Sequence, residues 1–375
     1  MKKKFIPVNK PLIHREDISC INKTLNEGWV SAEGPNVSLF EKKFSKYIGH
    51  KYGITLANGT AALEVAVQSL NLPKQSEVII PNFTIFSNAI ACIKNNLKIK
   101  PVDCDIYDWN MNLEKIKKAI TNKTKLIIAT HIYNYPLKID ILKKICKRKK
   151  IYIIEDTAEV LGQKYKGKMC GSFGDLSTYS FYANKQITTG EGGMITTNSK
   201  KLSDKVKSLR NLSFGSDNRF NHDDVSSNNR MSNIQATLGL SQLGRINQII
   251  KKRHFVGKKY YDYLNKNNNL FIPIPANKYS KNIYWVVAIL ITNKNLKIDA
   301  NYVMKKLKLK GIGTRPFFWP MHKQKMLKKY DFFKSKSFIN SEYISKYGFY
   351  LPSSLSLSLK EIKFISKCVN EIIKK

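Results

Sequence analysis

Short apolar runs alternate with amphipathic segments through the first 250 residues of the chain. The runs are rich in β-branched residues and predict strands over residues 52–58, 76–82, 98–105, 124–133 and 151–156. Apolar residues with helical spacing predict helices over residues 37–49, 60–72, 86–96, 113–121 and 139–150. Runs that are apolar almost throughout are typical of parallel strands covered on both faces. The pattern therefore predicts a doubly wound α/β domain with a mainly parallel sheet.

The last third of the chain has a different arrangement. Residues 233–264 predict one or two long helices that lead out of the large domain, and residues 284–291 predict a strand beyond them. Ser358–Glu361 has the spacing of a capping box and predicts the start of a final helix. We therefore expect a large domain over residues 1–247, including the N-terminal segment, and a smaller α+β domain over residues 248–375.

The composition fits a folded chain with a sizeable core, because 42% of the 375 residues are hydrophobic and 11% are aromatic. The apolar runs are far shorter than the roughly 20 residues of a membrane span, and the basic start is followed by no apolar segment of the kind found in signal peptides. The six cysteines are scattered and have no histidine at ligand spacing. We expect no metal site, no disulfide framework and a cytoplasmic location.

The net charge is large: 65 Lys and Arg residues stand against 27 Asp and Glu residues, which gives +38. A charge of this size suits a protein that binds polyanions. However, nearly all of it is lysine in small clusters, whereas proteins that recognise nucleic acids depend on arginine for bidentate contacts. Compositional bias is the better interpretation. We expect neither nucleic acid nor membrane as a partner, and at most a mild attraction of anionic substrates.

Two strand ends carry candidate chemistry, and ligands bind at the carboxyl ends of parallel strands. In "ANGTAAL", a strand ends near Gly59 and a helix begins, which creates either an ordinary turn or a phosphate site at a helix N-terminus. In "IIEDTAE", Asp156 follows an apolar strand. It could cap a helix, or it could hold a proton on the ring nitrogen of a cofactor.

The third candidate is Lys185 in "SFYANKQITTGEGGMITTN". Taken alone, it is best explained as an exposed lysine in a turn. A buried lysine, however, loses its charge more easily and can form Schiff bases. A phosphate cradle, a carboxylate and a lysine, in this order in one α/β domain, are what an enzyme needs to bind pyridoxal 5'-phosphate (PLP). The combination predicts PLP as the cofactor.

The segment "GSFGDLSTYSFYANKQITTGEGGMITTN" resembles the core motif of the DegT/DnrJ/EryC1/StrS sugar aminotransferases. The likeness extends from "GWVSAEGPNVSLFEKKF" near the start to "GFYLPSS" near the end, so it covers nearly the whole chain. It implies the fold type I aminotransferase architecture and an enzyme that transfers amino groups between an amino acid and a nucleotide-linked keto sugar.

The resemblance assigns roles around the cofactor ring. Lys185 matches the lysine that holds PLP and moves the proton, and Asp156 matches the residue that pairs with the pyridine nitrogen. Glu159 stands where relatives often have Gln or His, near the phenolic oxygen. Many relatives stack an aromatic side chain on the ring at the position of Ile85. Either Phe86 replaces it here or an aliphatic side chain packs on the ring.

The resemblance also assigns the phosphate contacts. The backbone of Thr60 and Ala61, next to Gly59, would hold the phosphate, and Ser180 would add its hydroxyl. In "SNNRMSN", Asn228 matches an asparagine that reaches the phosphate from the neighbouring subunit. The active unit is therefore expected to be a homodimer with shared active sites.

The segment "GIGTRPFFWPMH" resembles a subgroup that transfers the amino group of L-glutamate to C4 of GDP-4-keto-6-deoxy-D-mannose, for surface polysaccharides such as O-antigen. By this likeness Arg315, Phe317 and His322 are candidates for binding the nucleotide diphosphate sugar, although Phe317 could equally pack in the core. The alternatives are a 4-aminotransferase for UDP- or dTDP-linked 4-keto-6-deoxyglucose and, more distantly, a non-catalytic binding protein on the same scaffold.

Overall fold

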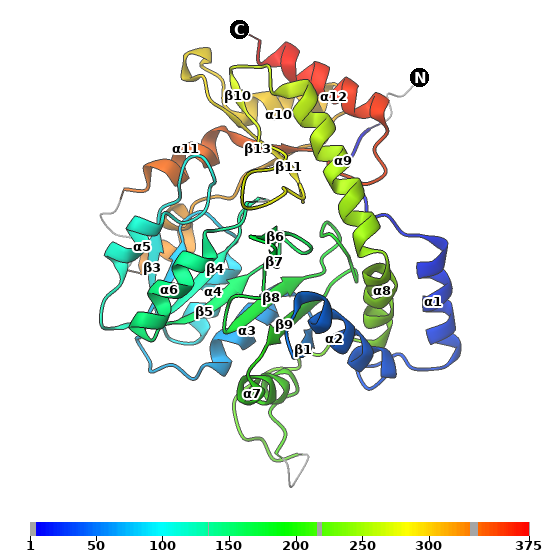
Figure 1. Cartoon of the computed structure of the whole chain (residues 1–375), viewed down its shortest axis with the longest axis vertical. Coiled ribbons are helices and arrows are strands. Elements are labelled where there is room, and N and C mark those ends of the chain that lie inside the picture. The colour runs from blue at the N-terminus through cyan, green and yellow to red at the C-terminus, as the bar shows by residue number, and fades with distance from the viewer. Residues whose placement is uncertain (1–4, 134, 216–219, 331–336, 375) are drawn as a thin grey trace.

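The computed structural model describes residues 5–133, 135–215, 220–330 and 337–374. Its larger part is built on a seven-stranded sheet in the order β1-β9-β8-β5-β4-β2-β3 (Figure 1). Strand β9 runs antiparallel to both of its neighbours, and all the other pairs in the sheet are parallel. The strands are β1 (Tyr52–Leu56), β2 (Glu77–Pro81), β3 (Lys98–Val102), β4 (Thr124–Thr130), β5 (Tyr152–Asp156), β8 (Leu176–Ser180) and β9 (Gly193–Thr197). The predicted α/β class with a mainly parallel sheet is confirmed.

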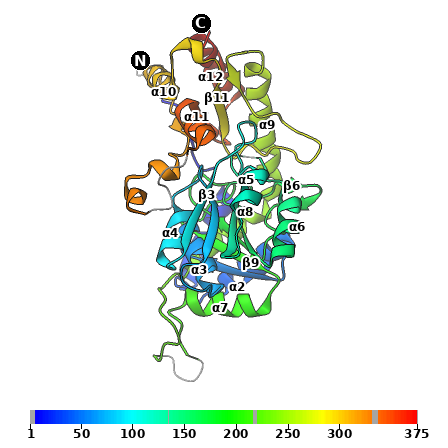
Figure 2. The same cartoon turned by 90° about the vertical axis from the view of Figure 1, so that its left-hand side faces the viewer.

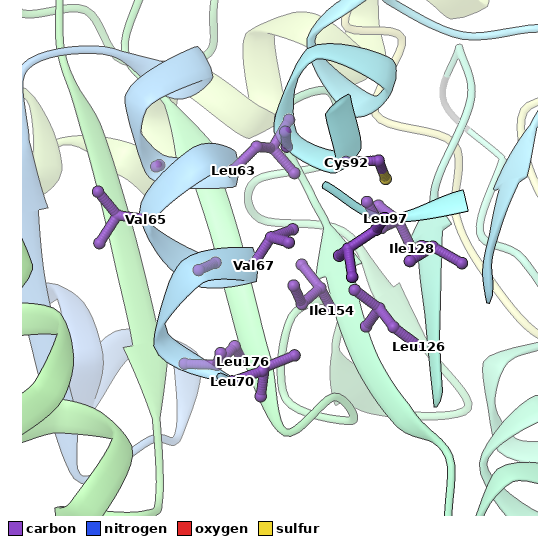
Figure 3. Packing of buried hydrophobic residues seen from close by; sticks show 14 of the residues in the cluster. Leu63, Val65, Val67, Leu70, Cys92, Leu97, Leu126, Ile128, Ile154 and Leu176 are labelled. Carbon is purple, nitrogen blue, oxygen red and sulfur yellow. The ribbon is translucent and has the colours of Figure 1, made fainter. Parts of the chain in front are cut away.

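Helices cover both faces of this sheet, and successive side chains of one strand point to opposite faces. In β2, Val78 and Ile80 join the cluster that contains α3, α4 and α7, whereas Ile79 joins the cluster that contains α5 and α6. Figure 3 shows the first cluster, where Leu63 and Val67 of α3 lie among side chains of the strands. These helices are α3 (Gly59–Ser69), α4 (Ser87–Lys94), α5 (Leu113–Ala119), α6 (Ile139–Lys149) and α7 (Lys200–Arg210). Burial on both faces explains the continuous apolar runs.

The helices and strands that the pattern predicts before residue 157 are all present, with bounds that differ by a few residues. The predicted segment 233–264 consists of two helices that separate at Arg245. The pattern does not predict β8 and β9, because glycines and polar residues interrupt the segment in which they lie. Other helices around the large sheet are α1 (Arg15–Asn26), α2 (Pro35–Ile48), α8 (Asn233–Gly244) and α9 (Ile246–Leu264); β6 (Lys164–Tyr165) and β7 (Lys168–Met169) form a small hairpin.

A second, antiparallel sheet in the order β10-β11-β13-β12 lies in the C-terminal part. Its elements are β10 (Leu270–Phe271), β11 (Val287–Ile291), α10 (Ala300–Leu309), β12 (Arg315–Pro316), α11 (Ile339–Tyr347), β13 (Gly348–Leu351) and α12 (Leu359–Ile372). The predicted capping box starts α12: the Ser358 hydroxyl accepts a hydrogen bond from the Glu361 N–H, and the Glu361 carboxylate accepts one from the Ser358 N–H. The smaller antiparallel sheet is confirmed.

Helix α9 runs from the large part into the small part (Figures 1 and 2), and an aromatic cluster also joins the two parts. Ile246 and Ile249 at the start of α9 pack in a cluster of the large part, whereas Tyr260 and Leu264 pack in the core of the small part. The aromatic cluster combines rings from the loops of the large sheet with rings from the small sheet: Phe83, Trp109, Tyr133, Trp285, Phe317 and Tyr350. The two sheets are thus joined by packed side chains and by one continuous helix.

The N-terminal segment, which the sequence prediction places with the large domain, packs on the small part. The Ile6 N–H donates to the Gly311 carbonyl, and the Gly313 N–H donates to the Ile6 carbonyl, both at 2.8 Å. The Ile6 side chain is buried in the small core. Within the described residues, no helix is both long and apolar enough to cross a bilayer.

Gly257 of α9 has no room for a side chain, because a Cβ there would overlap the ring of Tyr284. We expect Gly257→Ala to lower the free energy of unfolding by about 1–3 kcal/mol, the usual cost of overpacking a core. Gly244 in α8 is the matched control, because a Cβ there meets no atom within 4 Å. Gly244→Ala should be neutral or stabilising by up to about 1 kcal/mol. Urea unfolding of the two variants tests this, and equal stabilities would contradict it.

Candidate active site

A cavity of about 800 Å³ lies where the carboxyl ends of β4, β5 and β8 face the small part. Eight of the residues predicted from the sequence line it: Gly59, Thr60, Ala61, Asp156, Glu159, Ser180, Lys185 and Arg315. These residues come from two strand ends and the loops after them, one helix start and the small sheet, so only the folded chain brings them together. Asn228, Phe317 and His322 are not among the residues that line this cavity.

One end of the cavity is formed by the turn between β1 and α3. The Asn58 side chain caps α3 by accepting a hydrogen bond from the Ala61 N–H at 2.9 Å. Within the described residues, the N–H groups of Gly59 and Thr60 have no hydrogen-bond acceptor. A Cβ on Gly59 would lie 2.8 Å from the Cβ of Ser180, so only glycine allows this close approach. The two free N–H groups and the Ser180 hydroxyl form an anion site. The Ala61 N–H does not contribute to this site, because it donates to the Asn58 side chain.

Asp156 ends β5 at the floor of the cavity, with only 2% of its surface exposed. It accepts hydrogen bonds from the Ala158 N–H at 3.2 Å and from the Thr130 hydroxyl at 3.4 Å. No helix starts after it, so it is not a helix cap. Burial raises the pKa of Asp156, and within the described residues no cation lies at ion-pair distance from it. This carboxylate can accept a hydrogen bond from a positively charged ring nitrogen in the cavity.

The neighbouring Glu155 has a structural role, because it points to the opposite face of β5. Its carboxylate accepts a hydrogen bond from His131 at 2.8 Å and bonds from the N–H groups of Phe173 and Gly174. Burial alone would raise the pKa of Glu155, but these hydrogen bonds hold it below the usual value. The acidic pair in the sequence therefore divides into one carboxylate that fixes a loop and one that faces the cavity.

Lys185 lies in the wall of the cavity and is partly exposed to it. Its Nζ is 3.8 Å from the centroid of the Trp285 ring. Burial lowers the pKa of Lys185, the carboxylates of Glu159 and Asp156 oppose this effect, and the charge of Arg253 adds to it. The net decrease raises the fraction of neutral amine at neutral pH, and the neutral form is the nucleophile and proton acceptor.

Glu159 is also buried at the cavity, with 4% of its surface exposed. Its carboxylate accepts a hydrogen bond from the Tyr133 N–H at 2.6 Å. Burial raises the pKa of Glu159 to about 8, although the nearby Lys185 acts in the opposite direction. The raised pKa brings the protonated form of this side chain within reach near neutral pH, and in that form it can donate a hydrogen bond as the Gln or His of relatives would.

The small part supplies the opposite wall of the cavity. Arg315 of β12 pairs in register with Tyr350 of β13, and both line the cavity together with Phe318. Of the two residues considered for packing on the cofactor ring, Ile85 lines the cavity and is 45% exposed. Phe86 instead packs against the core of the large part. An aliphatic side chain, not an aromatic one, is available on that side.

The three predicted residues outside the cavity lining have other surroundings. Phe317 is 4% exposed in the aromatic cluster between the two parts, which is the core-packing alternative stated above. His322 bonds to Asn82 and, at 3.0 Å, to Glu342. Asn228 is exposed, on a segment whose next residue, Asn229, lines the cavity of its own chain.

Sequence reasoning missed Trp285 and Tyr350 as members of the site. Trp285 lies in the predicted strand 284–291 and Tyr350 lies in "GFYLPSS", but an aromatic residue in or beside a strand is explained as well by core packing. A sequence without spatial neighbours holds no signal that separates these two roles. Trp285 lies two residues before β11, so its place in the cavity lining depends on how the small sheet packs on the large part.

The comparisons with known proteins agree with this geometry. The profile of the DegT/DnrJ/EryC1/StrS aminotransferase family matches residues 11–370. The chain belongs to this family. It is 34% identical over 372 residues to the GDP-perosamine synthase of Escherichia coli O157:H7, with 98% of each chain covered, and 33% identical to that of Vibrio cholerae, with 97% of this chain and 98% of the relative covered.

A solved structure shares the fold: the putative sugar aminotransferase Spr1654 from Streptococcus pneumoniae, in its PLP form, aligns with a TM-score of 0.91 over 99% of both chains at 22% identity. The chain therefore has the fold type I aminotransferase architecture and is a PLP-dependent sugar-nucleotide aminotransferase.

The residues around the cavity fit PLP. The free N–H groups at the start of α3 suit its phosphate, Asp156 suits its ring nitrogen and Lys185 suits its aldehyde carbon. Two further buried polar atoms of the lining, Thr178 Oγ1 and Asn184 Oδ1, have no hydrogen-bond partner within the described residues. Buried polar atoms are rarely left without a partner, so these two indicate space for a polar ligand.

The raised pKa of Glu159 predicts a pH-dependent stability of the cofactor-free protein. The folded state holds a proton that the unfolded state loses near pH 4.5, so stability falls as the pH rises from there to about 8. Glu159→Gln removes this loss. The quantity to compare is the free energy of unfolding of the variant minus that of the wild type. We expect this difference to be larger at pH 8 than at pH 5 by more than about 1.4 kcal/mol, which is the equivalent of one pKa unit.

Urea unfolding at several pH values measures this difference. Glu114→Gln is the control, because Glu114 is exposed on α5, where solvent screens its charge. A variant of Glu159 that follows the wild-type pH profile would show that this carboxyl is ionised in the folded protein.

Proposed function

We propose that this enzyme transfers the amino group of L-glutamate to C4 of GDP-4-keto-6-deoxy-D-mannose and so forms GDP-perosamine for a surface polysaccharide. The observation that carries the proposal is the position of Lys185, whose amine lies in one cavity with Asp156, two free N–H groups and Arg315. The choice of sugar is supported by the full-length likeness to two GDP-perosamine synthases and by Arg315 in "RPFFWPMH", which contributes a cation to the cavity wall.

PLP, when bound, supplies an electron sink that stabilises negative charge on the carbon bearing the amino group. Asp156 would keep the ring nitrogen protonated, which the sink requires. The Gly59 and Thr60 N–H groups and the Ser180 hydroxyl would hold the phosphate. Glu159, in its protonated form, would donate a hydrogen bond to the phenolic oxygen.

Lys185 would move the proton in both halves of the reaction. Its neutral amine can take a proton from the carbon of the amino donor, and the same Nζ can later deliver a proton to C4 of the sugar. Arg315 would attract the carboxylate of the donor and the diphosphate of the sugar nucleotide in turn. Tyr350 and Phe318 beside it offer apolar faces for the sugar.

We further propose that the active unit is a homodimer in which Asn228 reaches the phosphate site of the partner. Asn228 is exposed, and it lies on the segment after α7 that projects away from both sheets (Figures 1 and 2). The same segment exposes Phe220 by 80% and Val225 by 90%. Large apolar side chains with this exposure are typical of surfaces that contact another chain.

Removal of the amine tests the catalytic assignment. We expect Lys185→Ala to keep the fold and to lose turnover by about 10³-fold or more, because no other side chain can move the proton at that position. Circular dichroism checks the fold, and a coupled assay for 2-oxoglutarate measures turnover. Lys251→Ala, an exposed change on α9, is the control. Turnover by Lys185→Ala at the wild-type rate would refute the assignment.

A product assay tests the substrate. The PLP-loaded enzyme and L-glutamate are supplied with GDP-4-keto-6-deoxymannose or with the UDP- or dTDP-linked 4-keto-6-deoxyglucose, and mass spectrometry detects the amino sugar. We expect the GDP sugar to be aminated at least about ten times faster than either alternative, a difference of about 1.4 kcal/mol in transition-state binding. Lys185→Ala serves as the negative control. Amination of only a glucose-configured sugar would keep the mechanism and reject the perosamine assignment.

A further inference from the structure

Arg253, in the middle of α9, is a buried cation directly behind the catalytic amine. Only 3% of its surface is exposed. Its Nη2 donates to the backbone carbonyl of Lys185 at 3.2 Å, and its Nη1 donates to the backbone carbonyl of Trp285 at 2.7 Å. The guanidinium therefore links the loop that carries the amine to the strand region that carries the indole.

Trp285 also contacts the loop that carries Lys185. Its indole N–H donates to the carbonyl of Asn184 at 2.9 Å, and its ring lies 3.8 Å from Lys185 Nζ. Two successive carbonyls, those of Asn184 and Lys185, are thus held by residues of the predicted small domain. The amine itself belongs to the loop after β8 in the large part.

The charge of Arg253 is unusual for a purely structural contact. Within the described residues, no carboxylate lies at ion-pair distance from it, and its Nε has no hydrogen-bond partner. Burial lowers its pKa to about 10. By contrast, Arg245 on the turn before α9 bonds to both carboxylate oxygens of Asp17. An unpaired buried cation costs several kcal/mol, and a neutral amide could bond to a carbonyl without that cost.

The charged groups that face the Lys185 amine come from two directions. Asp156 and Glu159 approach from the end of β5 and the turn after it, and Arg253 approaches from α9. The first two favour a charged amine, whereas Arg253 disfavours it. Without Arg253, only the carboxylates and burial would set the charge of the amine.

We propose that Arg253 is a positioning residue for the reaction: it fixes the Asn184–Lys185 backbone and, through Trp285, ties the amine to the small part. The amine then keeps one place relative to both walls of the cavity, and a cation behind it favours its neutral form. This assignment holds for any sugar nucleotide that the enzyme accepts, so it does not depend on the perosamine proposal.

Two variants separate the geometric contribution from the electrostatic one. Arg253→Gln removes the charge and one of the two carbonyl contacts. Arg253→Lys keeps the charge, but its single ammonium cannot reproduce the planar fork that reaches both carbonyls. Arg245→Lys is the control, because it makes the same change in a partly buried arginine that bonds to Asp17 and not to the Lys185 loop.

The experiment uses the PLP-loaded full-length enzyme and two readouts. The first is the pH midpoint of the change in the visible absorption of the bound cofactor, which reports protonation of the Lys185 nitrogen. The second is kcat and KM for L-glutamate. We expect Arg253→Gln to raise the midpoint by about one pH unit and to lower kcat at least about tenfold. Arg253→Lys should keep the midpoint within a few tenths of a unit and still lower kcat at least about tenfold, and KM should change less than about threefold in both.

The control should lose stability without a change in either readout. If Arg253→Gln keeps the wild-type midpoint and kcat and only loses stability, as the control does, Arg253 is structural and the proposal is wrong. If Arg253→Gln does not fold, Arg253→Lys decides the question: a lowered kcat at near-wild-type KM supports the proposal, and a wild-type kcat overturns it.

Discussion

The Lys185 amine, whose pKa is lowered mainly by burial, lies between the large and the small part of the molecule. Burial favours the neutral form, Asp156 and Glu159 favour the charged form, and Arg253 favours the neutral form again. The two carboxylates come from the end of β5 and the turn after it, the amine from the loop after β8, and the guanidinium from α9, so the balance exists only when these three parts are packed together. The packing of the two sheets and of α9 holds the two carboxylates, the amine and the guanidinium close together. Within the described residues, none of the four groups forms an ion pair with another.

The parallel sheet provides one side of this framework. Strands β4, β5 and β8 end at the same edge, so Thr130, Asp156 and Ser180 face one cavity. The alternation of side chains along β5 separates Glu155 from Asp156, and only the second is free to meet a ligand. The start of α3 adds N–H groups, which the dipole of the helix makes attractive to a phosphate.

The small part provides the other side, and aromatic packing fixes its position. Phe317 and Tyr133, whose ring centroids are 4.5 Å apart, belong to the cluster that joins the two parts. This placement leaves the neighbouring Arg315 and Phe318 in the cavity wall. The position of the cavity wall that carries Arg315 and Phe318 therefore depends on how the two parts pack. Substitutions in the aromatic cluster would move this wall relative to the Lys185 amine.

The α/β class, the capped final helix and the cavity residues Asp156, Ser180 and Lys185 could be predicted from the amino-acid sequence, because periodicity, caps and a long local motif are encoded by neighbouring positions. The sequence does not show which aromatic residues reach the cavity: Phe317 and Trp285 both pack in the aromatic cluster, yet the Trp285 ring also lies against the Lys185 amine. It also gave no indication that Arg253, 68 residues beyond Lys185, contacts its backbone. These features depend on contacts between elements that are distant along the chain, so they become apparent only in the folded protein.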